Sequence, residues 1–196
     1  MIPYKSNAVE DALMEFRVGG KTNFGYLAPL RKHLGRQKFD ILASLAFPRG
    51  YRQRGAGKAD LTFAISPHGI LDKQRMIRRW ANKINKFCIG PRYHKHTDSM
   101  LIYYSFFEGL SRIGEEVPVH AHVLIKTNDQ NKFIFTSESG DSLAETFWHQ
   151  ITEISPISKY TDVSPIFDNV GAIDYVTKHC HDTWHFDAMY WHSDKS

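Results

Sequence analysis

The chain has 196 residues, of which 42% are hydrophobic and 23% are charged, which is ordinary for a soluble globular protein. This length predicts a single domain over residues 1–196, with peripheral extensions at residues 1–37 and 185–196. No stretch approaches the roughly 18 apolar residues of a membrane span. Residues 1–6 lack the apolar core of a secretory signal, so we expect no membrane partner.

Net charge and cysteine content restrict the function less strongly. A net charge of +4 permits a polyanionic partner without requiring one. Cys88 and Cys180 have the spacing of neither a metal site nor a disulfide framework, so a reducing, cytoplasmic compartment fits best.

The first third of the chain predicts a short helix, a buried strand and a basic loop. Residues 7–16 fit an amphipathic helix, residues 40–47 a buried strand, and residues 61–65 a second short apolar segment. The loop between the apolar segments carries Arg49, Arg52, Arg54 and Lys58. Its sequence GAGKA (residues 55–59) is only superficially like a phosphate-binding loop, because the first glycine is misplaced and Ala59 has no hydroxyl for Mg²⁺. We therefore expect no nucleotide cofactor.

The clearest helix is predicted from Asp72, as its N-cap, to the glycine and proline at residues 90–91. Its apolar stripe consists of Ile77, Trp80, Ala81, Ile84 and Cys88. Its other positions carry Lys73 and five candidate DNA-binding residues, Arg75, Arg78, Arg79, Lys83 and Lys86. A solvated helix face would explain this charge, and so would a face that contacts DNA phosphates.

Two apolar segments, residues 100–110 and 118–126, predict a β-hairpin with a turn-rich connector. Residues 133–136 predict a short additional strand. Residues 142–151 predict a helix, and a last helix is expected to begin near Val170. The apolar side of the first of these helices would consist of Leu143, Phe147 and Ile151.

The second hairpin strand contains two histidines, His120 and His122, separated by one small residue. On a strand, their imidazoles point to the same face. If the hairpin turns about Gly114, Glu108 lies directly opposite His120 and shares that face. Two imidazoles and a carboxylate can bind one divalent cation and leave positions open for phosphate and water, which suits Mg²⁺ or Mn²⁺.

Other interpretations of the histidine pair remain open at this point. The two residues could be hydrogen-bonded strand histidines, and a register slip of one residue would send Glu108 to the opposite face. Residues 94–96 (HKH) have the same spacing but lie in an expected surface loop. The pair also matches the opening of a cupin motif, but Lys126 and Thr127 stand where that motif needs a glutamate.

Tyr175 and Lys178 are three residues apart, so on a helix they share a face. A tyrosine hydroxyl has an ordinary pKa near 10 and is a poor nucleophile at neutral pH. An adjacent ammonium group and a metal-polarised phosphate would both assist its attack. Tyr160 and Tyr190 are weaker candidates for the same role.

These residues together resemble the HUH endonuclease superfamily, in particular the rolling-circle replication initiators (Rep proteins) of small phages and plasmids. The resemblance covers about residues 38–185 and depends on the histidine pair, the upstream glutamate and the tyrosine–lysine pair, in this order. It implies an α+β fold whose central antiparallel sheet, of about five strands, is ferredoxin- or RRM-like and flanked by helices. It also implies that His120 and His122 are metal ligands, with Glu108 as a candidate third ligand. Tyr175 would be the nucleophile and Lys178 its partner.

The activity implied is metal-dependent, sequence-specific nicking and rejoining of single-stranded DNA. The tyrosine would form a 5′-phosphotyrosine and leave a 3′-hydroxyl that primes synthesis. The expected partners are single-stranded or hairpin origin DNA and, because no helicase domain follows, a separate host helicase. Only one tyrosine occupies the motif, whereas some phage initiators use two.

Two groups of alternatives remain. Tyrosine transposases and relaxases of the same superfamily share the chemistry, but transposases usually take their third ligand from the tyrosine helix and relaxases usually have a third histidine. The alternative from another class is a non-catalytic single-stranded nucleic-acid-binding protein. Its stacking platforms would be Tyr103, Tyr104, Phe106 and Phe107.

Overall fold

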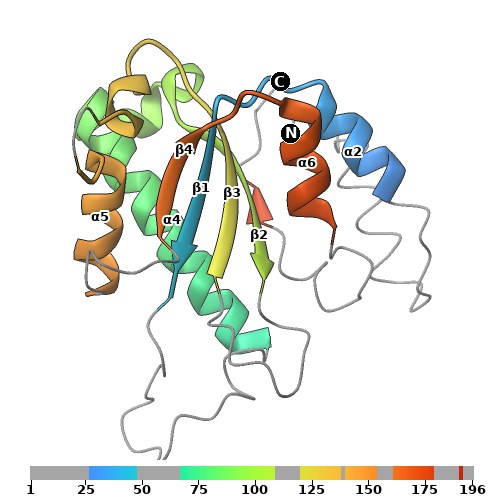
Figure 1. The fold of residues 1–196 in the computed structure, drawn as a ribbon. Coiled ribbons are helices and arrows are strands. Elements are labelled where there is room, and N and C mark those ends of the chain that lie inside the picture. The colour runs from blue at the N-terminus through green and yellow to red at the C-terminus, as the bar shows by residue number, and fades with distance from the viewer. Residues whose placement is uncertain are drawn as a thin grey trace, which may run out of the picture.

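The computed structural model describes residues 27–47, 67–108, 120–137, 140–153, 161–178 and 190–191. These residues form an α+β fold in which an antiparallel sheet lies between two layers of helices (Figure 1). The helices are α2 (Leu27–Gly35), α4 (Pro67–Ile89), α5 (Leu143–Thr152) and α6 (Asn169–Thr177). The strands are β1 (Ile41–Ala46), β2 (Ile102–Glu108), β3 (His120–Lys126), β4 (Asp162–Pro165) and β5 (Tyr190–Trp191). Short 3-10 helices are η2 (Tyr93–Lys95), η3 (Thr97–Ser99) and η4 (Lys132–Phe135).

The sheet has the strand order β4-β1-β3-β2-β5, and every neighbouring pair is antiparallel. Along the chain, β1, α4, β2, β3, α5 and β4 follow one another as strand, helix, strand, strand, helix and strand. The expected α+β class with a central antiparallel sheet is therefore confirmed.

The register of the central hairpin agrees with the prediction. Glu108 on β2 pairs with His120 on β3, and Phe106 pairs with His122. Because side chains alternate along a strand, His120, His122 and Leu124 share one face of β3. The turn about Gly114 lies outside the described residues.

One face of the sheet is covered by α4 and α5, and their interface forms the larger core. Trp80 of α4 and Trp148 of α5 are fully buried and meet edge to face, with ring centroids 6.3 Å apart. The expected apolar stripe of α4 is confirmed, since Ile77, Trp80, Ala81 and Ile84 are buried and Cys88 packs against the same cluster. The predicted start of this helix is wrong: α4 begins at Pro67, and a proline is favoured in the first helical turn.

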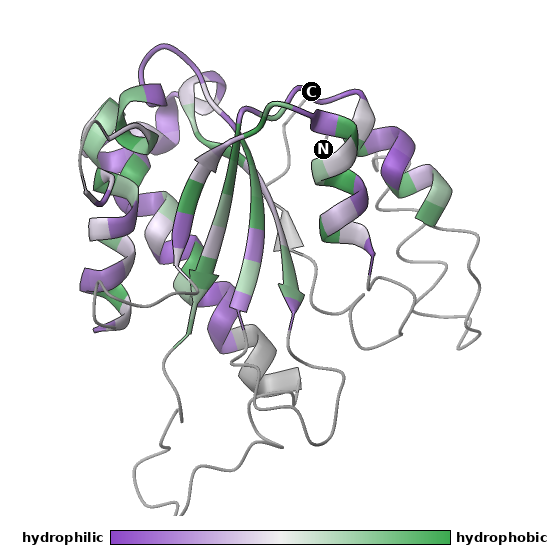
Figure 2. Cartoon of the chain, viewed as in Figure 1, coloured by the Kyte–Doolittle hydropathy of each residue, from purple (hydrophilic) through white to green (hydrophobic). Residues whose placement is uncertain are grey.

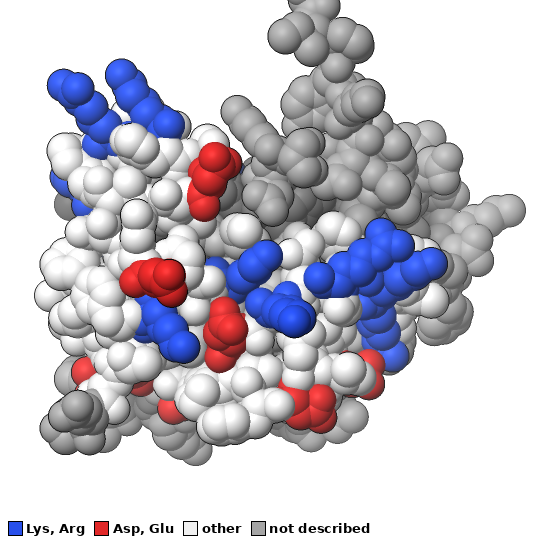
Figure 3. All heavy atoms as spheres, turned by 90° about the horizontal axis from the view of Figure 1, so that it is seen from above, with Lys and Arg blue, Asp and Glu red and all other residues white. Residues whose placement is uncertain are grey.

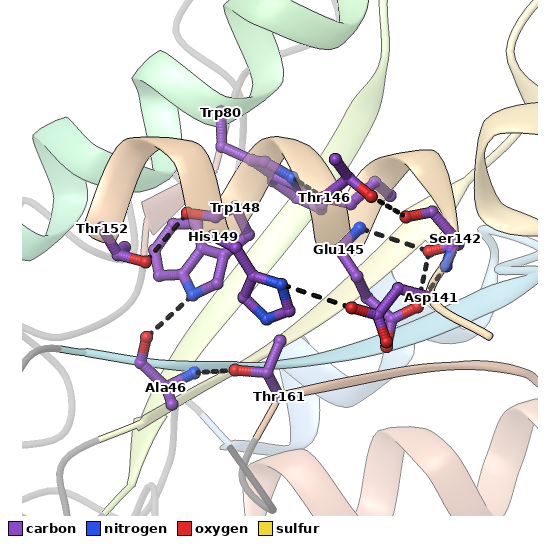
Figure 4. A network of polar contacts seen from close by, with 11 residues as sticks. Ala46, Trp80, Asp141, Ser142, Glu145, Thr146, Trp148, His149, Thr152 and Thr161 are labelled. Carbon is purple, nitrogen blue, oxygen red and sulfur yellow. Dashed lines mark hydrogen bonds and ion pairs between the residues drawn. The ribbon is translucent and has the colours of Figure 1, made fainter. Parts of the chain in front are cut away.

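A capping box begins α5. The Ser142 hydroxyl accepts a hydrogen bond from the Glu145 amide, and the Glu145 carboxylate accepts one from the Ser142 amide (Figure 4). The helix was predicted correctly, and Phe147 and Ile151 face the core as expected. The expectation for Leu143 is wrong. Leu143 is 40% exposed, whereas Ala144 and Phe147 are buried. The reason is that α5 packs against both α4 and β1, which turns Leu143 outwards.

Indole hydrogen bonds fix α5 to its neighbours. Trp148 Nε1 donates to the Ala46 carbonyl of β1 at 2.8 Å (Figure 4), and Trp80 Nε1 donates to the Ala144 carbonyl at 2.8 Å. Both rings thus satisfy their single polar group inside the core. These bonds hold α4 and α5 in a defined position on this face of the sheet.

The short strand predicted at residues 133–136 is wrong, because Lys132–Phe135 form the 3-10 helix η4. Ile134 and Phe135, which are neighbours in the sequence, are both buried. The Asn131 carbonyl accepts from the Ile134 amide at 3.2 Å, three residues on, as this helix type requires.

The other face of the sheet is covered by α2 and α6, whose apolar side chains form a second core with β2 and β3. The buried residues of this core are Leu30, Leu34, Phe39, Tyr104, Phe106, Leu124, Ile173 and Val176. The helix α2 lies within the segment 1–37 that we expected to be peripheral, and β5 lies within the segment 185–196. Figure 2 shows that the central strands β1 and β3 are largely hydrophobic and that the lower ends of β2 and β3 are hydrophilic.

Several expected features lie outside the described residues. They are the helix at residues 7–16, the apolar segment at 61–65, the basic loop with Arg49, Arg52, Arg54 and Lys58, and the alternative nucleophile Tyr160. Of Tyr190, the structure describes only the backbone, in β5. Among the helices described, none has the length and apolar character needed to cross a membrane.

Candidate metal centre

The hydrophilic ends of β2 and β3 bring together the three predicted ligands. His120 and His122 are 9% and 5% exposed, and Glu108 is half-buried between them and the helix α6. Glu108 Oε2 lies 2.7 Å from His122 Nε2 and 3.5 Å from His120 Nε2. The strand pairing produces this arrangement, because directly opposed side chains of neighbouring strands share a face.

The three groups have the geometry of a metal site. One ligand atom from each of Glu108, His120 and His122 lies within 4.8 Å of the others. A cation between them would replace the short contact from Glu108 to His122 and would be held by two neutral nitrogens and one negative oxygen. This set could hold a metal ion and, with three ligands, would leave coordination positions for other groups.

The pKa values of the cluster favour the protonation states that ligands need. Burial by itself raises the pKa of Glu108, but hydrogen bonds from Lys178 and His122 hold that pKa at about 2. The pKa of His122 is lowered to about 4, first by burial and then by the neighbouring His120, against the opposing effect of Glu108. At neutral pH, Glu108 is thus a carboxylate and His122 a neutral imidazole.

The helix α6 places Tyr175 and Lys178 beside the ligands, as their spacing predicted. The Tyr175 hydroxyl lies 3.4 Å from His122 Nε2, and the two rings are 5.0 Å apart at their centroids. Lys178 Nζ lies 3.1 Å from Glu108 Oε1 and 3.9 Å from the centre of the Tyr175 ring. Tyr175 is 43% exposed, so its side chain reaches the surface while its hydroxyl lies against the ligand cluster.

The orientation of α6 comes from its N-cap and from α2. Asp168 accepts hydrogen bonds from the Val170 and Gly171 amides at the start of the helix. At its other end, Arg31 of α2 donates to the Thr177 hydroxyl at 2.9 Å and forms an ion pair with Asp174 at 3.3 Å. These contacts fix the turn of α6 that carries Tyr175.

Ser44 is a further residue of this centre that was not among the predicted site residues. This residue lies opposite His122 in the β1–β3 pairing, and its Oγ is 3.1 Å from His122 Nδ1. A signal was present, because Ser44 is the polar residue inside an otherwise apolar strand segment. What the sequence lacks is the pairing of β1 with β3, which are separated by α4 and β2.

The candidate DNA-binding residues of α4 are not brought to this centre. They lie on the helix that covers the opposite face of the sheet. Arg75 forms an ion pair with Asp72 at 2.9 Å. Lys83 donates to Gln150 and lies over the Phe147 ring. Arg78, Arg79 and Lys86 are exposed on the same helix.

Two other sequence expectations can be placed in the structure. Residues 94–96 are exposed in and after η2, as expected for a surface loop. The aromatic residues proposed as stacking platforms are all buried, at 2% for Tyr103, 6% for Tyr104, 3% for Phe106 and 3% for Phe107. Helices cover both faces of β2, so these rings belong to the two cores.

Comparisons with known proteins give no independent guide to the function. The chain matches no protein-family model, no curated protein and no solved structure. What the chain can do therefore has to be argued from the arrangement of Glu108, His120, His122, Tyr175 and Lys178.

Proposed function

We propose that this chain is a metal-dependent, sequence-specific single-stranded DNA endonuclease and strand transferase of the HUH type, which initiates rolling-circle replication. One observation carries this proposal: the Tyr175 hydroxyl lies against a cluster of two histidines and one glutamate, 3.4 Å from His122 Nε2. A tyrosine that served only to pack the core would be buried. Tyr175 is instead partly exposed, with its hydroxyl beside a candidate metal ligand.

The order of elements supports the same family. A strand–helix–strand–strand–helix–strand succession with the order β4-β1-β3-β2 is the ferredoxin-like split β-α-β arrangement. In this chain the histidine pair lies on a central strand and the tyrosine on a helix that covers the same face. This is the placement that the HUH resemblance implies.

The donor set fits a divalent cation that accepts both nitrogen and oxygen. Mg²⁺ prefers oxygen ligands, whereas Mn²⁺ binds imidazole more readily, so we expect Mn²⁺ to bind more tightly. His120, His122 and Glu108 would hold the ion. Bound there, it would polarise a non-bridging oxygen of the scissile phosphate.

The reaction at the tyrosine is a transesterification. The Tyr175 oxygen loses its proton and forms a bond to phosphorus. The bond from phosphorus to the 3′-oxygen breaks, and the 3′-oxygen takes up a proton. Reversal of the step rejoins the strand, because one phosphoester bond replaces another and no ATP is needed. Lys178 lies over the Tyr175 ring at 3.9 Å and would favour the phenolate and the charge that develops on phosphate.

Lys178 also restricts the orientation of the Glu108 carboxylate. Its ammonium group holds Glu108 Oε1 at 3.1 Å, which leaves Oε2 directed to the histidines. Glu108 would therefore bind a metal ion through one oxygen. The lysine thus has two tasks, to orient a ligand and to stabilise negative charge near the nucleophile.

The alternatives from the same superfamily differ in the third ligand. In this chain a glutamate on β2 completes the cluster, and a lysine stands at the end of the tyrosine helix. This arrangement favours an initiator over a transposase or a relaxase. A non-catalytic nucleic-acid binder is disfavoured because the aromatic residues that it would use for stacking are buried.

The test is covalent capture of DNA. The purified protein, incubated with a single-stranded or hairpin origin oligonucleotide and Mn²⁺, is expected to cut the strand and to retain its 5′ end as an adduct. The adduct is measured by denaturing gel and by mass spectrometry. Tyr175→Phe is expected to form none, whereas the control Tyr93→Phe, on η2, forms the wild-type amount. An adduct on the Tyr175→Phe variant would reject the nucleophile, and no adduct on the wild type with any origin strand would reject the class.

A further inference from the structure

Positive charge is unevenly distributed over the face of the sheet that carries the candidate metal centre. Residues 27–39, which form α2 and the turn after it, contain Arg31, Lys32, Arg36 and Lys38 and no acidic residue. Lys32, Arg36 and Lys38 are exposed. Figure 3 shows a group of Lys and Arg side chains on the side of the molecule where α2 lies.

The histidine of this segment has a different role. His33 Nε2 lies 2.9 Å from the Tyr104 hydroxyl of β2, and burial and Arg36 both lower the pKa of the imidazole. His33 is therefore neutral at pH 7 and attaches α2 to the sheet. The charge of the surface comes from the lysines and arginines alone.

The basic segment 27–39 runs along α6, from near the candidate metal centre to the opposite end of that helix. Gln37 and Phe39 form hydrogen bonds with Asn169, the first residue of α6, so Arg36 and Lys38 lie towards that far end. Arg31 donates to the Thr177 hydroxyl, and Thr177 directly precedes Lys178, whose ammonium group holds Glu108. A polyanion bound at the metal centre would thus meet α2 next, without crossing an edge of the sheet.

The helix α4 offers a less suitable surface, although it carries more positive charges. It covers the opposite face of the sheet, so the whole sheet separates its side chains from Tyr175. Several of its cations are already engaged, among them Arg75 with Asp72 and Lys83 with Gln150 and the Phe147 ring.

We propose that single-stranded DNA runs across α2, where Lys32, Arg36 and Lys38 bind its phosphates on the way to the catalytic centre. This inference deepens the proposed function and rests on it for the identity of the polyanion. The cations of α4 then serve solubility and packing rather than binding of the substrate.

The experiment compares charge reversals on the two faces. The α2 variant is Lys32→Glu/Arg36→Glu/Lys38→Glu, and the control is Arg78→Glu/Arg79→Glu/Lys86→Glu on α4, which changes the net charge by the same amount. Affinity for a fluorescein-labelled mixed-sequence single strand is measured by anisotropy at several salt concentrations. EDTA is present, so that neither metal binding nor cleavage contributes.

The wild type is expected to lose affinity steeply with salt, and the α2 variant to lose about 2 units of the slope of log K against log salt, since each phosphate contact contributes about 0.7. The α4 control should keep the wild-type slope. The inference is overturned if the control loses as much as the α2 variant, if the α2 variant binds like the wild type, or if the wild type binds no single strand. Circular dichroism checks folding, and the Gln versions of the α2 substitutions repeat the test without charge reversal.

The outcome is distinguishable from a failure of the proposed function. If the α2 variant loses DNA binding but the wild type never forms a tyrosine adduct, the DNA-binding role of α2 is supported and the nuclease proposal is rejected. If the wild type forms the adduct and the α2 variant forms it with unchanged dependence on DNA concentration, the nuclease proposal is supported and the DNA-binding role of α2 is rejected.

Discussion

His122 makes a contact through each nitrogen of its ring, Nδ1 with Ser44 Oγ at 3.1 Å and Nε2 with Glu108 Oε2 at 2.7 Å. In the metal-free protein a carboxylate at Nε2 favours a proton on that nitrogen, so the Ser44 hydroxyl donates to Nδ1. A metal ion at Nε2 requires the other tautomer, in which Nδ1–H donates to Ser44. A hydroxyl suits both states because it can donate as well as accept.

We expect Ser44→Ala to weaken Mn²⁺ binding about 10- to 100-fold, the usual cost of removing the outer partner of a ligating histidine. Isothermal titration calorimetry measures the affinity, and ¹⁵N NMR of the imidazole reports the tautomer in the metal-free protein. Ser44→Thr keeps the hydroxyl and should bind like the wild type. If the Ala variant binds Mn²⁺ with unchanged affinity, Ser44 does not position His122.

The lowered pKa of His122 makes metal-free stability depend on pH. The folded value is about 4, against 6.5 for an ordinary histidine, so between these values the unfolded chain binds a proton that the folded chain does not. The free energy of unfolding is therefore expected to fall as pH drops from 6.5 towards 4, by up to about 3 kcal/mol at about 1.36 kcal/mol per pKa unit.

Urea denaturation in EDTA at several pH values measures this loss, with His122→Gln as the comparison. The variant should lose the His122 part of the slope, while His94→Gln, an exposed histidine, should keep it. His33, whose pKa is also lowered, contributes in all three proteins and cancels. Equal slopes in the wild type and the His122→Gln variant would contradict the expectation.

At the level of elements, local signals and tertiary contacts contribute separately to α5. Its capping box is local, with Glu145 Oε2 2.7 Å from both the amide and the hydroxyl of Ser142. Its position on the sheet is tertiary, because Trp148 and Trp80 form hydrogen bonds across the core. Loss of the cap should therefore weaken the fold without moving the candidate metal centre on the opposite face.

Ser142→Ala is expected to lower the free energy of unfolding by about 1 kcal/mol, the typical cost of losing a helix N-cap. Urea denaturation gives the stability, and adduct formation gives the activity, which should be unchanged at a temperature where the variant is folded. Ser137→Ala, at an exposed position outside any helix, is the control and should be neutral. A loss of activity in folded Ser142→Ala protein would show that the two faces are coupled.

The elements were predictable where a local pattern was complete. Alternating and contiguous apolar residues located β1, β2 and β3, and the spacing of Ile77, Trp80 and Ile84 located the buried side of α4. The short segment at residues 133–136 was mispredicted because a mainly apolar run of four residues does not distinguish a strand from a 3-10 helix.

At the scale of the whole molecule, the sheet divides the functional residues into two groups. The candidate metal centre, the tyrosine helix and the basic segment 27–39 share one face, and the basic helix α4 covers the other. The sequence indicated a basic surface on α4, because charge on a long amphipathic helix is easy to recognise. It contained no sign that the shorter segment packs along the helix that carries Tyr175.

The sequence by itself determined the candidate ligands and the register between them. The spacing of His120 and His122 set their common face, and the pairing expected of two consecutive strands placed Glu108 opposite His120. It also determined that Tyr175 and Lys178 share a helix face. All of these relations are local, since they join residues within one strand, one hairpin or one helix.

Only the tertiary structure decided which elements meet. The packing of α6 on the histidine face brings Tyr175 to His122, and the pairing of β1 with β3 brings Ser44 to the same ring. The side of the sheet on which α2 and α4 lie follows from how both apolar faces of the sheet are covered. The sequence of an amphipathic helix shows which of its sides must be buried. The surface that covers this side is determined only when the whole chain packs.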